Sequence, residues 1–278
     1  MSDLKVQTFG ARRYEGKVCL VTASTQGIGL AIAGRFAAEG AKVCVSSRKQ
    51  DAVDEAVAAI KALPGVDAAG IIGMVCHVDK REHREAILKA TVEKLGTIDV
   101  LVLNAAASSF TGLTMDTPEK HYDKIMRTNL RSTFLFAQDA MPFLTKPGAV
   151  PSKPSAFTTN ILMTGSITGY EPAAPIGIYA VAKTAMQGLM KAMNAELAPR
   201  GIRVNLLAPG LIRTNLSEML VDQAESDGGK VSGITPCCVL GRVGEPSEMA
   251  GVASFACSAD ASYVTGETFV AAGGSPRL

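Results

Sequence analysis

Two residues of the sequence have side chains and spacing suited to moving a proton. Tyr179 and Lys183 are four positions apart in a segment with helical periodicity, so their side chains share one helix face. A free tyrosine has a pKa near ~10, and a neighbouring ammonium favours its phenolate form. The pair is therefore a candidate for acid–base chemistry, although this spacing also arises often by chance.

Two further polar residues have structural explanations as well as chemical ones. Ser166 lies in a Gly-Ser-Ile-Thr-Gly turn thirteen residues before Tyr179, and a single serine there more often caps the turn. Asn129 lies in a helical segment, where an asparagine alone indicates a bend or a cap. Neither residue indicates catalysis by itself.

Residues 22–29 have the composition of a phosphate-binding turn. The sequence Thr-Ala-Ser-Thr-Gln-Gly-Ile-Gly follows a strand-like run and opens a helix, whose first N–H groups can bind an anion. The turn does not match Gly-x-Gly-x-x-Gly, so an ordinary strand-to-helix turn is an equal alternative on spacing alone.

The elements that must position these residues alternate between strands and helices. The helix over 118–144 is expected in two pieces that meet near Thr128 and Asn129, and Ser247 is expected to cap the last helix. This order predicts an α/β fold, with a doubly wound parallel sheet and helices on both faces. Strands are expected at 18–22, 42–47, 71–78, 100–103, 161–163, 203–207 and 268–270, and helices at 30–39, 51–63, 82–95, 118–144, 179–197 and 247–256.

Composition restricts the classes of protein that fit. With 47% hydrophobic and 19% charged residues, the 278-residue chain is not expected to be disordered, and a net charge of +2 gives no reason to expect nucleic acid as a partner. No apolar run reaches the ~18 residues of a membrane span. The six cysteines form no Cys-x-x-Cys pair and are expected to be reduced, and the three histidines form no metal-binding cluster, so no metal site is expected.

One domain is expected over residues 1–278. Residues 1–15 are interpreted as an N-terminal extension without the apolar region of a secretory signal. Residues 145–159 contain three prolines and a glycine and are expected to form an exposed loop. No internal repeat or linker divides the chain.

In their order along the chain, these segments resemble the motifs of the short-chain dehydrogenase/reductase family. The turn at 22–29 is similar to Thr-Gly-x-x-x-Gly-x-Gly, with Ala23 in place of the first glycine. Residues 103–106 are similar to Asn-Asn-Ala-Gly, residues 179–183 to Tyr-x-x-x-Lys, and Pro209-Gly210 to the turn after the sixth strand. Within the family, the chain resembles the NADPH-dependent carbonyl reductases of the dehydrogenase/reductase member 4 type at residues 21–25, 45–50, 207–212, 241–246 and 261–267.

The resemblance implies a Rossmann-type fold and a role for each catalytic candidate. Tyr179 would donate a proton to the substrate oxygen while hydride arrives from a nicotinamide, and Ser166 would hydrogen-bond the same oxygen. Lys183 would hold the nicotinamide ribose and tune Tyr179, and Asn129 would anchor a water that links Lys183 to solvent. The residues implied in cofactor binding are Thr22, Ser24, Gln26, Gly27, Ile28, Gly29, Ser47, Arg48, Lys49, Val78, Asn104, Ala105, Ala106, Tyr179, Lys183, Pro209, Gly210, Ile212 and Thr214.

The end of the second predicted strand bears on the choice of cofactor. In a dinucleotide fold this position faces the adenosine ribose, and an acidic residue there repels a 2′-phosphate. The chain has Ser47 at this position, followed by Arg48 and Lys49, which could bind the phosphate. The alternative is a solvated basic start to the next helix, which the helix dipole mildly disfavours. We therefore expect NADP(H) as the cofactor.

The function implied by the resemblance is NADPH-dependent reduction of ketones, dicarbonyls or quinones. One alternative is an alcohol, hydroxysteroid or retinol dehydrogenase working in the oxidative direction, because the same site runs both ways. A second alternative is a non-catalytic nucleotide sensor, which would be free to lose Tyr179 or Lys183.

The substrate is expected to be a small apolar or aromatic carbonyl compound. The candidate pocket segments, residues 107–110, 167–170 and 211–220, carry no clustered positive charge. Their large side chains could equally belong to the core, and residues 216–220 are implied to be part of a mobile lid. These side chains are Phe110, Tyr170, Leu216, Met219 and Leu220.

Assembly and location are expectations from resemblance alone. The family resemblance implies a homotetramer, assembled through residues 128–144, 179–197 and the C-terminal segment. The protein is expected in the cytoplasm. The final Pro276-Arg277-Leu278 resembles a peroxisomal address except at its proline, so a peroxisome-like organelle or a frayed tail without an address are the alternatives.

Overall fold

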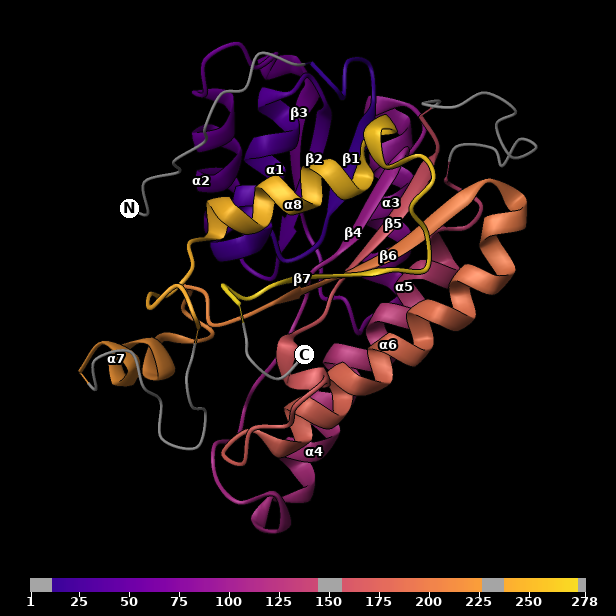
Figure 1. Cartoon of the computed structure of the whole chain (residues 1–278). Coiled ribbons are helices and arrows are strands. Elements are labelled where there is room, and N and C mark those ends of the chain that lie inside the picture. The colour runs from indigo at the N-terminus through magenta and orange to yellow at the C-terminus, as the bar shows by residue number, and fades with distance from the viewer. Residues whose placement is uncertain (1–11, 145–156, 227–237, 275–278) are drawn as a thin grey trace.

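The computed structural model describes residues 12–144, 157–226 and 238–274 (Figure 1). One sheet of parallel strands has the order β3-β2-β1-β4-β5-β6-β7. The α/β fold with a doubly wound sheet is therefore confirmed. The strands are β1 (Val18–Val21), β2 (Lys42–Ser47), β3 (Ile71–Val75), β4 (Val100–Leu103), β5 (Thr159–Thr164), β6 (Ile202–Pro209) and β7 (Thr268–Ala271).

Helices cover both faces of this sheet. The helices α1, α2 and α8 contribute to one hydrophobic core, and α3, α5 and α6 contribute to the other. Side chains alternate between the two cores along each strand, as the period of a strand requires. The helices are α1 (Gly27–Ala38), α2 (Gln50–Lys61), α3 (Arg81–Leu95), α4 (Glu119–Met126), α5 (Ser132–Ala140), α6 (Gly177–Leu197), α7 (Glu218–Ser226) and α8 (Pro246–Cys257).

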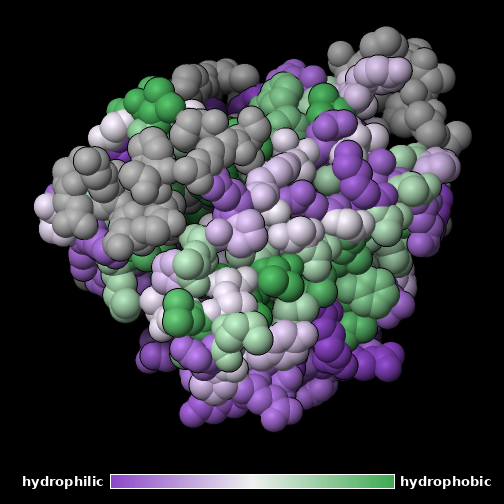
Figure 2. Space-filling view, turned by 60° about the horizontal axis from the view of Figure 1, so that its bottom comes forward, coloured by the Kyte–Doolittle hydropathy of each residue, from purple (hydrophilic) through white to green (hydrophobic). Residues whose placement is uncertain are grey.

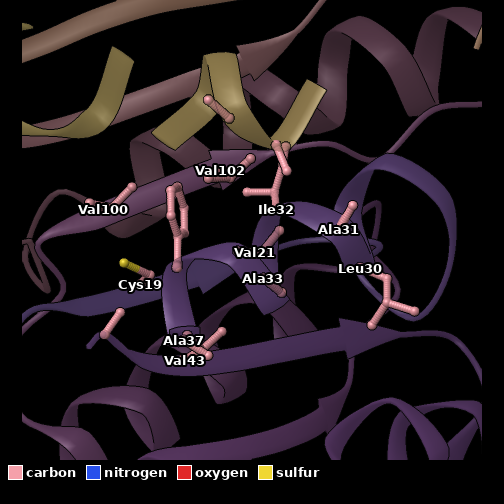
Figure 3. Packing of buried hydrophobic residues seen from close by; sticks show 14 of the residues in the cluster. Cys19, Val21, Leu30, Ala31, Ile32, Ala33, Ala37, Val43, Val100 and Val102 are labelled. Carbon is pink, nitrogen blue, oxygen red and sulfur yellow. The ribbon is translucent and has the colours of Figure 1, made fainter. Parts of the chain in front are cut away.

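The first core shows why alanine is frequent in α1. Ala31, Ala33 and Ala37 lie beside Ile32 between α8 and the sheet, where strand residues such as Val21 point toward them (Figure 3). Small side chains let α1 pack closely both on the strands and on α8, which lies across it (Figure 1). This packing holds the N-terminal end of α1 at the edge of the sheet.

A π-helical turn interrupts the helical segment after β4. The helix α4 ends at Met126, the turn spans Arg127–Arg131, and α5 begins at Ser132. The predicted division near Thr128 and Asn129 is confirmed. The hydroxyl of Thr133 donates to the carbonyl of Asn129 at 2.7 Å, which satisfies one acceptor at the irregular turn.

Most predicted bounds differ from the observed ones by one to four residues, and three differences have a clear physical reason or concern a named residue. The third strand ends at Val75, because β2, its partner, ends at Ser47 and residues 76–78 continue beyond the paired region. The cap of α8 is Glu245, which forms a capping box with Glu248, whereas Ser247 lies inside the helix. The loop predicted over 145–159 includes Thr159, which is the first residue of β5, and residues 145–156 lie outside the described residues.

The interpretation of residues 1–15 as an extension is also wrong in part. Residues 1–11 lie outside the described residues, but Tyr14 is fully buried against Phe36 of α1. Its hydroxyl donates to the carbonyl of Ser254 at 2.5 Å, and Arg13 forms an ion pair with Glu39. Tyr14 therefore belongs to the core formed by α1 and α8, and Arg13 is tied to it by an ion pair.

The described part of the chain has free cysteines at positions 19, 44, 76, 238 and 257. Within the described ranges, no cluster of histidine, cysteine and acidic side chains has the arrangement of a metal site. No described helix combines the length and the apolar character needed to cross a membrane.

Candidate active site

The carboxyl ends of neighbouring strands bring the predicted site residues to one edge of the sheet. The turn at 22–29 follows β1, Asn104 follows β4, Ser166 follows β5 and Gly210 follows β6. The chain order reverses between β1 and β4, which are paired although two strands and three helices separate them in sequence. In open α/β sheets, ligands bind at this kind of reversal.

The turn at 22–29 provides backbone space for a phosphate. Gly27 has a φ of 54°, and a Cβ atom on Gly29 would lie 2.4 Å from the carbonyl oxygen of Ala23. The N-cap of α1, Gln26, makes no side-chain capping bond, so its side chain leaves the first N–H groups of the helix uncapped. These features fit the pyrophosphate of a dinucleotide.

Side chains of the strand ends hold the turn in shape. The hydroxyl of Thr22 donates to the carbonyl of Val102 at 3.1 Å and accepts the N–H of Asn104 at 2.9 Å. The amide Nδ2 of Asn104 donates to the carbonyl of Ala23 at 3.0 Å. Thr22 and Asn104 therefore connect β1, β4 and the turn.

The hydroxyl and the N–H of Ser24 also form hydrogen bonds that hold the turn in place. Its hydroxyl donates to the carbonyl of Val21 at 2.7 Å and accepts the N–H of Ser46 at 2.9 Å. Its own N–H donates to the carbonyl of Ser46 at 2.8 Å. Ser24 thus ties the turn to the end of β2.

Ser166 and Tyr179 are brought together by β5 and the start of α6. Ser166 is the N-cap of the short 3-10 helix Ile167–Gly169, where its hydroxyl accepts the N–H of Thr168 at 3.1 Å. Burial raises the pKa of Tyr179 to about 12, and a hydrogen bond with Ser166 acts in the opposite direction. The structural and the chemical interpretations of Ser166 are thus compatible, since one hydroxyl caps the turn and contacts the phenol.

Lys183 is a buried cation without a carboxylate partner among its described contacts. Its side chain is 1% exposed, and Nζ donates to the carbonyl of Thr164 at 2.6 Å. Burial lowers the pKa of Lys183 to about 7. The expected lowering of the Tyr179 pKa by a fully charged lysine is therefore not what the structure shows, because desolvation disfavours the charged form of both groups.

Asn129 uses its side chain to fix the chain after β4. It is fully buried in the π-helical turn, and its amide accepts the N–H of Ala107 at 2.7 Å and donates to the carbonyl of Ala107 at 2.9 Å. These two bonds hold residues 105–107 against the helical segment. Ala105 and Ala106, both predicted cofactor contacts, lie in this held segment.

The end of β2 presents two cations. Arg48 and Lys49 are exposed, and their side chains make no hydrogen bond or ion pair with any described residue. Ser47, just before them, is half-buried. This arrangement leaves both cations available to an anionic ligand at the carboxyl edge of the sheet.

Val78 lies beyond the end of β3, beside this position. Its carbonyl accepts from Arg84 at 3.0 Å. Its N–H forms no hydrogen bond with another described residue. The structure therefore leaves the donor of Val78 for a ligand, in the way the prediction of a backbone contact requires.

The segment after β6 closes over the turn. Ile212 is buried, and Thr214 lies 3.0 Å from the position of a Cβ atom on Gly27. The side chain of Asn215 donates to Oε1 of Gln26 at 3.0 Å. Residues 25–27, 213–215 and α7 contribute to the lining of a cavity of about 1040 Å³.

Three of the five predicted pocket side chains are exposed, whereas Leu220 packs against a small hydrophobic cluster at Ala224. Tyr170, Leu216 and Met219 are 43%, 49% and 69% exposed, and Phe110 and Leu220 are half-buried. Figure 2 shows a face on which hydrophobic side chains lie between hydrophilic ones. Exposed apolar side chains next to Ser166 and on the segment before α7 favour the pocket interpretation over the core interpretation.

Sequence reasoning missed Thr164 and Ala107. Thr164 binds Lys183 through its carbonyl, and Ala107 binds Asn129. The pairing of Leu103 with Met163 puts the next residues, Asn104 and Thr164, side by side, so a strand alignment could have indicated that Thr164 lies beside Asn104, although not that it binds Lys183. No sequence pattern indicated the role of Ala107, because the contact uses its backbone.

Comparisons with known proteins agree on the family. A sequence profile described as enoyl-(acyl carrier protein) reductase matches residues 22–275. Dehydrogenase/reductase SDR family member 4 of Bos taurus is 45% identical over 95% of this chain and 90% of its own length. The human protein of that name is 44% identical over 94% of this chain and 87% of its own length.

Two further relatives extend the comparison. Tropinone reductase-like 3 of Erythroxylum coca is 44% identical over 95% of each chain. The crystal structure of a short-chain type dehydrogenase/reductase from Mycobacterium marinum is 31% identical, covers 98% of this chain and 100% of its own, and has a TM-score of 0.84. Enzymes of the short-chain dehydrogenase/reductase family are oxidoreductases that use nicotinamide cofactors. This chain belongs to that family and is of the dehydrogenase/reductase member 4 type.

Proposed function

We propose that the protein is an NADPH-dependent carbonyl reductase. The observation that carries this proposal is the meeting of Ser166, Tyr179 and Lys183 at the edge of the sheet where the phosphate turn also lies. Ser166 would hydrogen-bond the carbonyl oxygen of the substrate, Tyr179 would protonate that oxygen, and Lys183 would hold the ribose of the cofactor. The described strands form one sheet, which favours a single domain.

The protein's own residues have separate tasks in this reaction. The nicotinamide, when bound, supplies a hydride. The phenol of Tyr179 donates the proton, and a pKa raised to about 12 keeps that proton in place at neutral pH. The hydroxyl of Ser166 orients the substrate oxygen, and the buried Lys183 holds the ribose. Asn129 fixes the segment after β4, and we retain its implied role as a water anchor as part of the proposal.

NADPH is preferred in this proposal because of Arg48 and Lys49. Both cations lie after β2 with no described partner, and Ser47 replaces the acidic residue that would repel a 2′-phosphate. A planar guanidinium can donate two parallel hydrogen bonds to a phosphate. The remaining cofactor contacts are proposed at residues 22–29, Val78, Asn104 to Ala106, and residues 209–214.

The proposed substrates are small apolar or aromatic ketones, dicarbonyls and quinones. Tyr170 and Met219 offer exposed apolar surface beside Ser166 and on α7. The relative named for tropinone, a ketone, is consistent with a carbonyl substrate. We propose α7 and the residues before it as a lid of the site, because Asn215 donates a hydrogen bond to Gln26 of the phosphate turn.

Initial rates test the proposal directly. The purified protein is assayed with NADPH and NADH against an α-dicarbonyl, a quinone and an aromatic ketone, and with NADP⁺ against the matching alcohols. The proposal expects carbonyl-dependent NADPH consumption. Oxidation of alcohols without carbonyl reduction would favour the dehydrogenase alternative, and cofactor binding without turnover on any substrate would favour the nucleotide sensor.

We also propose that the protein assembles as a homotetramer and that it lies in the cytoplasm. Phe134 of α5, Val181 of α6, Phe255 of α8 and Val270 of β7 are large apolar side chains that are at least 39% exposed. Of these elements, α5, α6 and the C-terminal β7 belong to the expected assembly surfaces, and light scattering of the purified protein measures the assembly. The C-terminal Pro276-Arg277-Leu278 lies outside the described residues, and a fluorescent fusion with a free C-terminus that stays diffuse would remove the peroxisomal alternative.

A further inference from the structure

A continuous chain of hydrogen bonds joins the phosphate turn to the buried lysine. The carbonyl of Ala23 accepts Nδ2 of Asn104 at 3.0 Å, and Oδ1 of Asn104 accepts the hydroxyl of Thr164 at 3.1 Å. The carbonyl of Thr164 accepts Nζ of Lys183 at 2.6 Å. One residue, Thr164, therefore contacts both ends of the cofactor site, with its side chain toward the turn and its backbone toward the lysine.

The side chain of Thr164 settles the orientation of the Asn104 amide. An asparagine amide has a donor side and an acceptor side, and the hydroxyl of Thr164 is a donor matched to the acceptor side. With Oδ1 held in this way, Nδ2 is directed to the carbonyl of Ala23. Thr164 is 7% exposed, so water has little access to replace its hydroxyl.

The turn needs this support because of its backbone. Ala23 has a φ of 49°, in the left-handed region that is sterically unfavourable for a non-glycine residue. A residue held in such a conformation persists only when its surroundings determine it. The bond from Asn104 to the Ala23 carbonyl is one of those determinants, and Thr164 fixes the donor of that bond.

We propose that Thr164 is a positioning residue of the cofactor site, whose hydroxyl fixes the phosphate turn through Asn104. The inference rests on the proposed binding of a nicotinamide dinucleotide and goes beyond the residues that the sequence motifs indicate. The turn would hold the pyrophosphate, which NADPH and NADH share. Loss of the Thr164 hydroxyl therefore weakens both cofactors by the same factor, in contrast to a loss at Arg48.

The test is the substitution Thr164→Val, which keeps the shape of the side chain and removes its hydroxyl. Cofactor dissociation constants are measured by fluorescence titration of the protein with NADPH and with NADH, without a carbonyl substrate. We expect both constants to rise about fivefold or more, because Oδ1 of the half-buried Asn104 loses the hydrogen-bond donor that Thr164 provides. Thr164→Ser, which restores the hydroxyl, returns both constants to within about twofold of the wild type.

A second buried threonine gives the matched control. Thr91 is fully buried, and its hydroxyl donates to the carbonyl of Ile87 within α3. Thr91→Val is expected to lower the melting temperature without changing either dissociation constant. In activity assays, Thr164→Val is expected to raise the KM for NADPH while kcat stays within about threefold, because the carbonyl that holds Lys183 is unchanged.

The outcomes separate this inference from the proposed function. Wild-type binding of both cofactors with unchanged constants in Thr164→Val would overturn the role of Thr164 alone. Equal losses in Thr164→Val and Thr91→Val would also overturn it, since general destabilisation would then explain them. Absence of NADPH and NADH binding by the wild type would overturn the proposed function together with the inference.

Discussion

Nζ of Lys183 lies 5.4 Å from the centroid of the Tyr179 ring, and both groups are shielded from solvent strongly enough to favour their neutral forms. Burial raises the pKa of Tyr179 to about 12 and lowers the pKa of Lys183 to about 7. The site thus holds a protonated phenol beside a lysine whose burial disfavours the charged form. A protonated phenol is the form that reduction of a carbonyl requires.

Replacing Tyr179 with phenylalanine tests the proton donor. We expect kcat for carbonyl reduction to fall by at least ~10²-fold, the low end of general-acid effects. The dissociation constant of NADPH should stay within about twofold, because the ring is kept and only the hydroxyl is lost. Single-turnover rates and a fluorescence titration measure the two quantities. Near-normal turnover in the variant would exclude Tyr179 as the acid.

The lowered pKa of Lys183 predicts a dependence of stability on pH. Between pH 7 and about 10.5, the unfolded lysine binds a proton that the folded one has lost, so the free energy of unfolding rises with pH by up to ~1.36 kcal/mol per unit. Below pH 7 the folded protein carries the full cost of a buried ammonium. The wild type should therefore gain stability relative to Lys183→Met as the pH rises from 7 to 9.

Melting temperatures of the ligand-free proteins measure this difference at pH 6.5, 7.5 and 8.5. Because each kcal/mol corresponds to about 2–4 °C for a protein of this size, the melting temperature of the wild type minus that of Lys183→Met is expected to rise by several degrees from pH 6.5 to 8.5. Taking the difference between the two proteins removes titrations that they share. A gap that is constant with pH would mean that Lys183 keeps its proton in the folded state.

Periodicity and turn residues were enough to predict most of the sheet. The strands β2 and β4 have the predicted bounds, because Ala41 and Gly96 precede short apolar runs that pair along their whole length. The third strand was predicted too long because the apolar run continues past the last residue of β2. Strand length is decided by the partner strand, which local sequence does not contain.

The candidate site likewise contains residues that the sequence could predict and contacts that it could not. Tyr179, Lys183 and Ser166 were predicted from residue types and spacing, and the family resemblance gave them roles. The contacts of Thr164 with Lys183 and of Ala107 with Asn129 use backbone carbonyls or N–H groups, so the residue types gave no signal for these two contacts. The lowered pKa of Lys183 also could not be predicted, because it follows from burial by distant parts of the chain.

Replacing Ala23 with glycine is expected to stabilise the protein, unlike most substitutions by glycine. Ala23 has a φ of 49°, and glycine adopts this conformation without the steric cost that alanine has. Ala23→Gly also makes the unfolded chain more flexible, which offsets part of the gain by about 0.4–1 kcal/mol. We expect a net rise in melting temperature of about 1–3 °C. Ala58→Gly, at an exposed helical position of α2, is the control and should lower it. A similar decrease in both variants would show that Ala23 is not strained.

Replacing Arg48 with alanine tests the choice of cofactor. Arg48 is exposed after β2, forms no hydrogen bond or ion pair with another described side chain, and is proposed to bind the 2′-phosphate. The KM for NADPH should rise about tenfold or more, as expected for losing ~1.5–3 kcal/mol of charged hydrogen bonding, and NADH kinetics should barely change.

Arg200→Ala is the matched control, because Arg200 precedes β6 at the opposite edge of the sheet and pairs with Glu196. This control should leave both cofactors unaffected. Equal losses with NADPH and NADH in Arg48→Ala would mean that Arg48 supports the fold and does not read the phosphate.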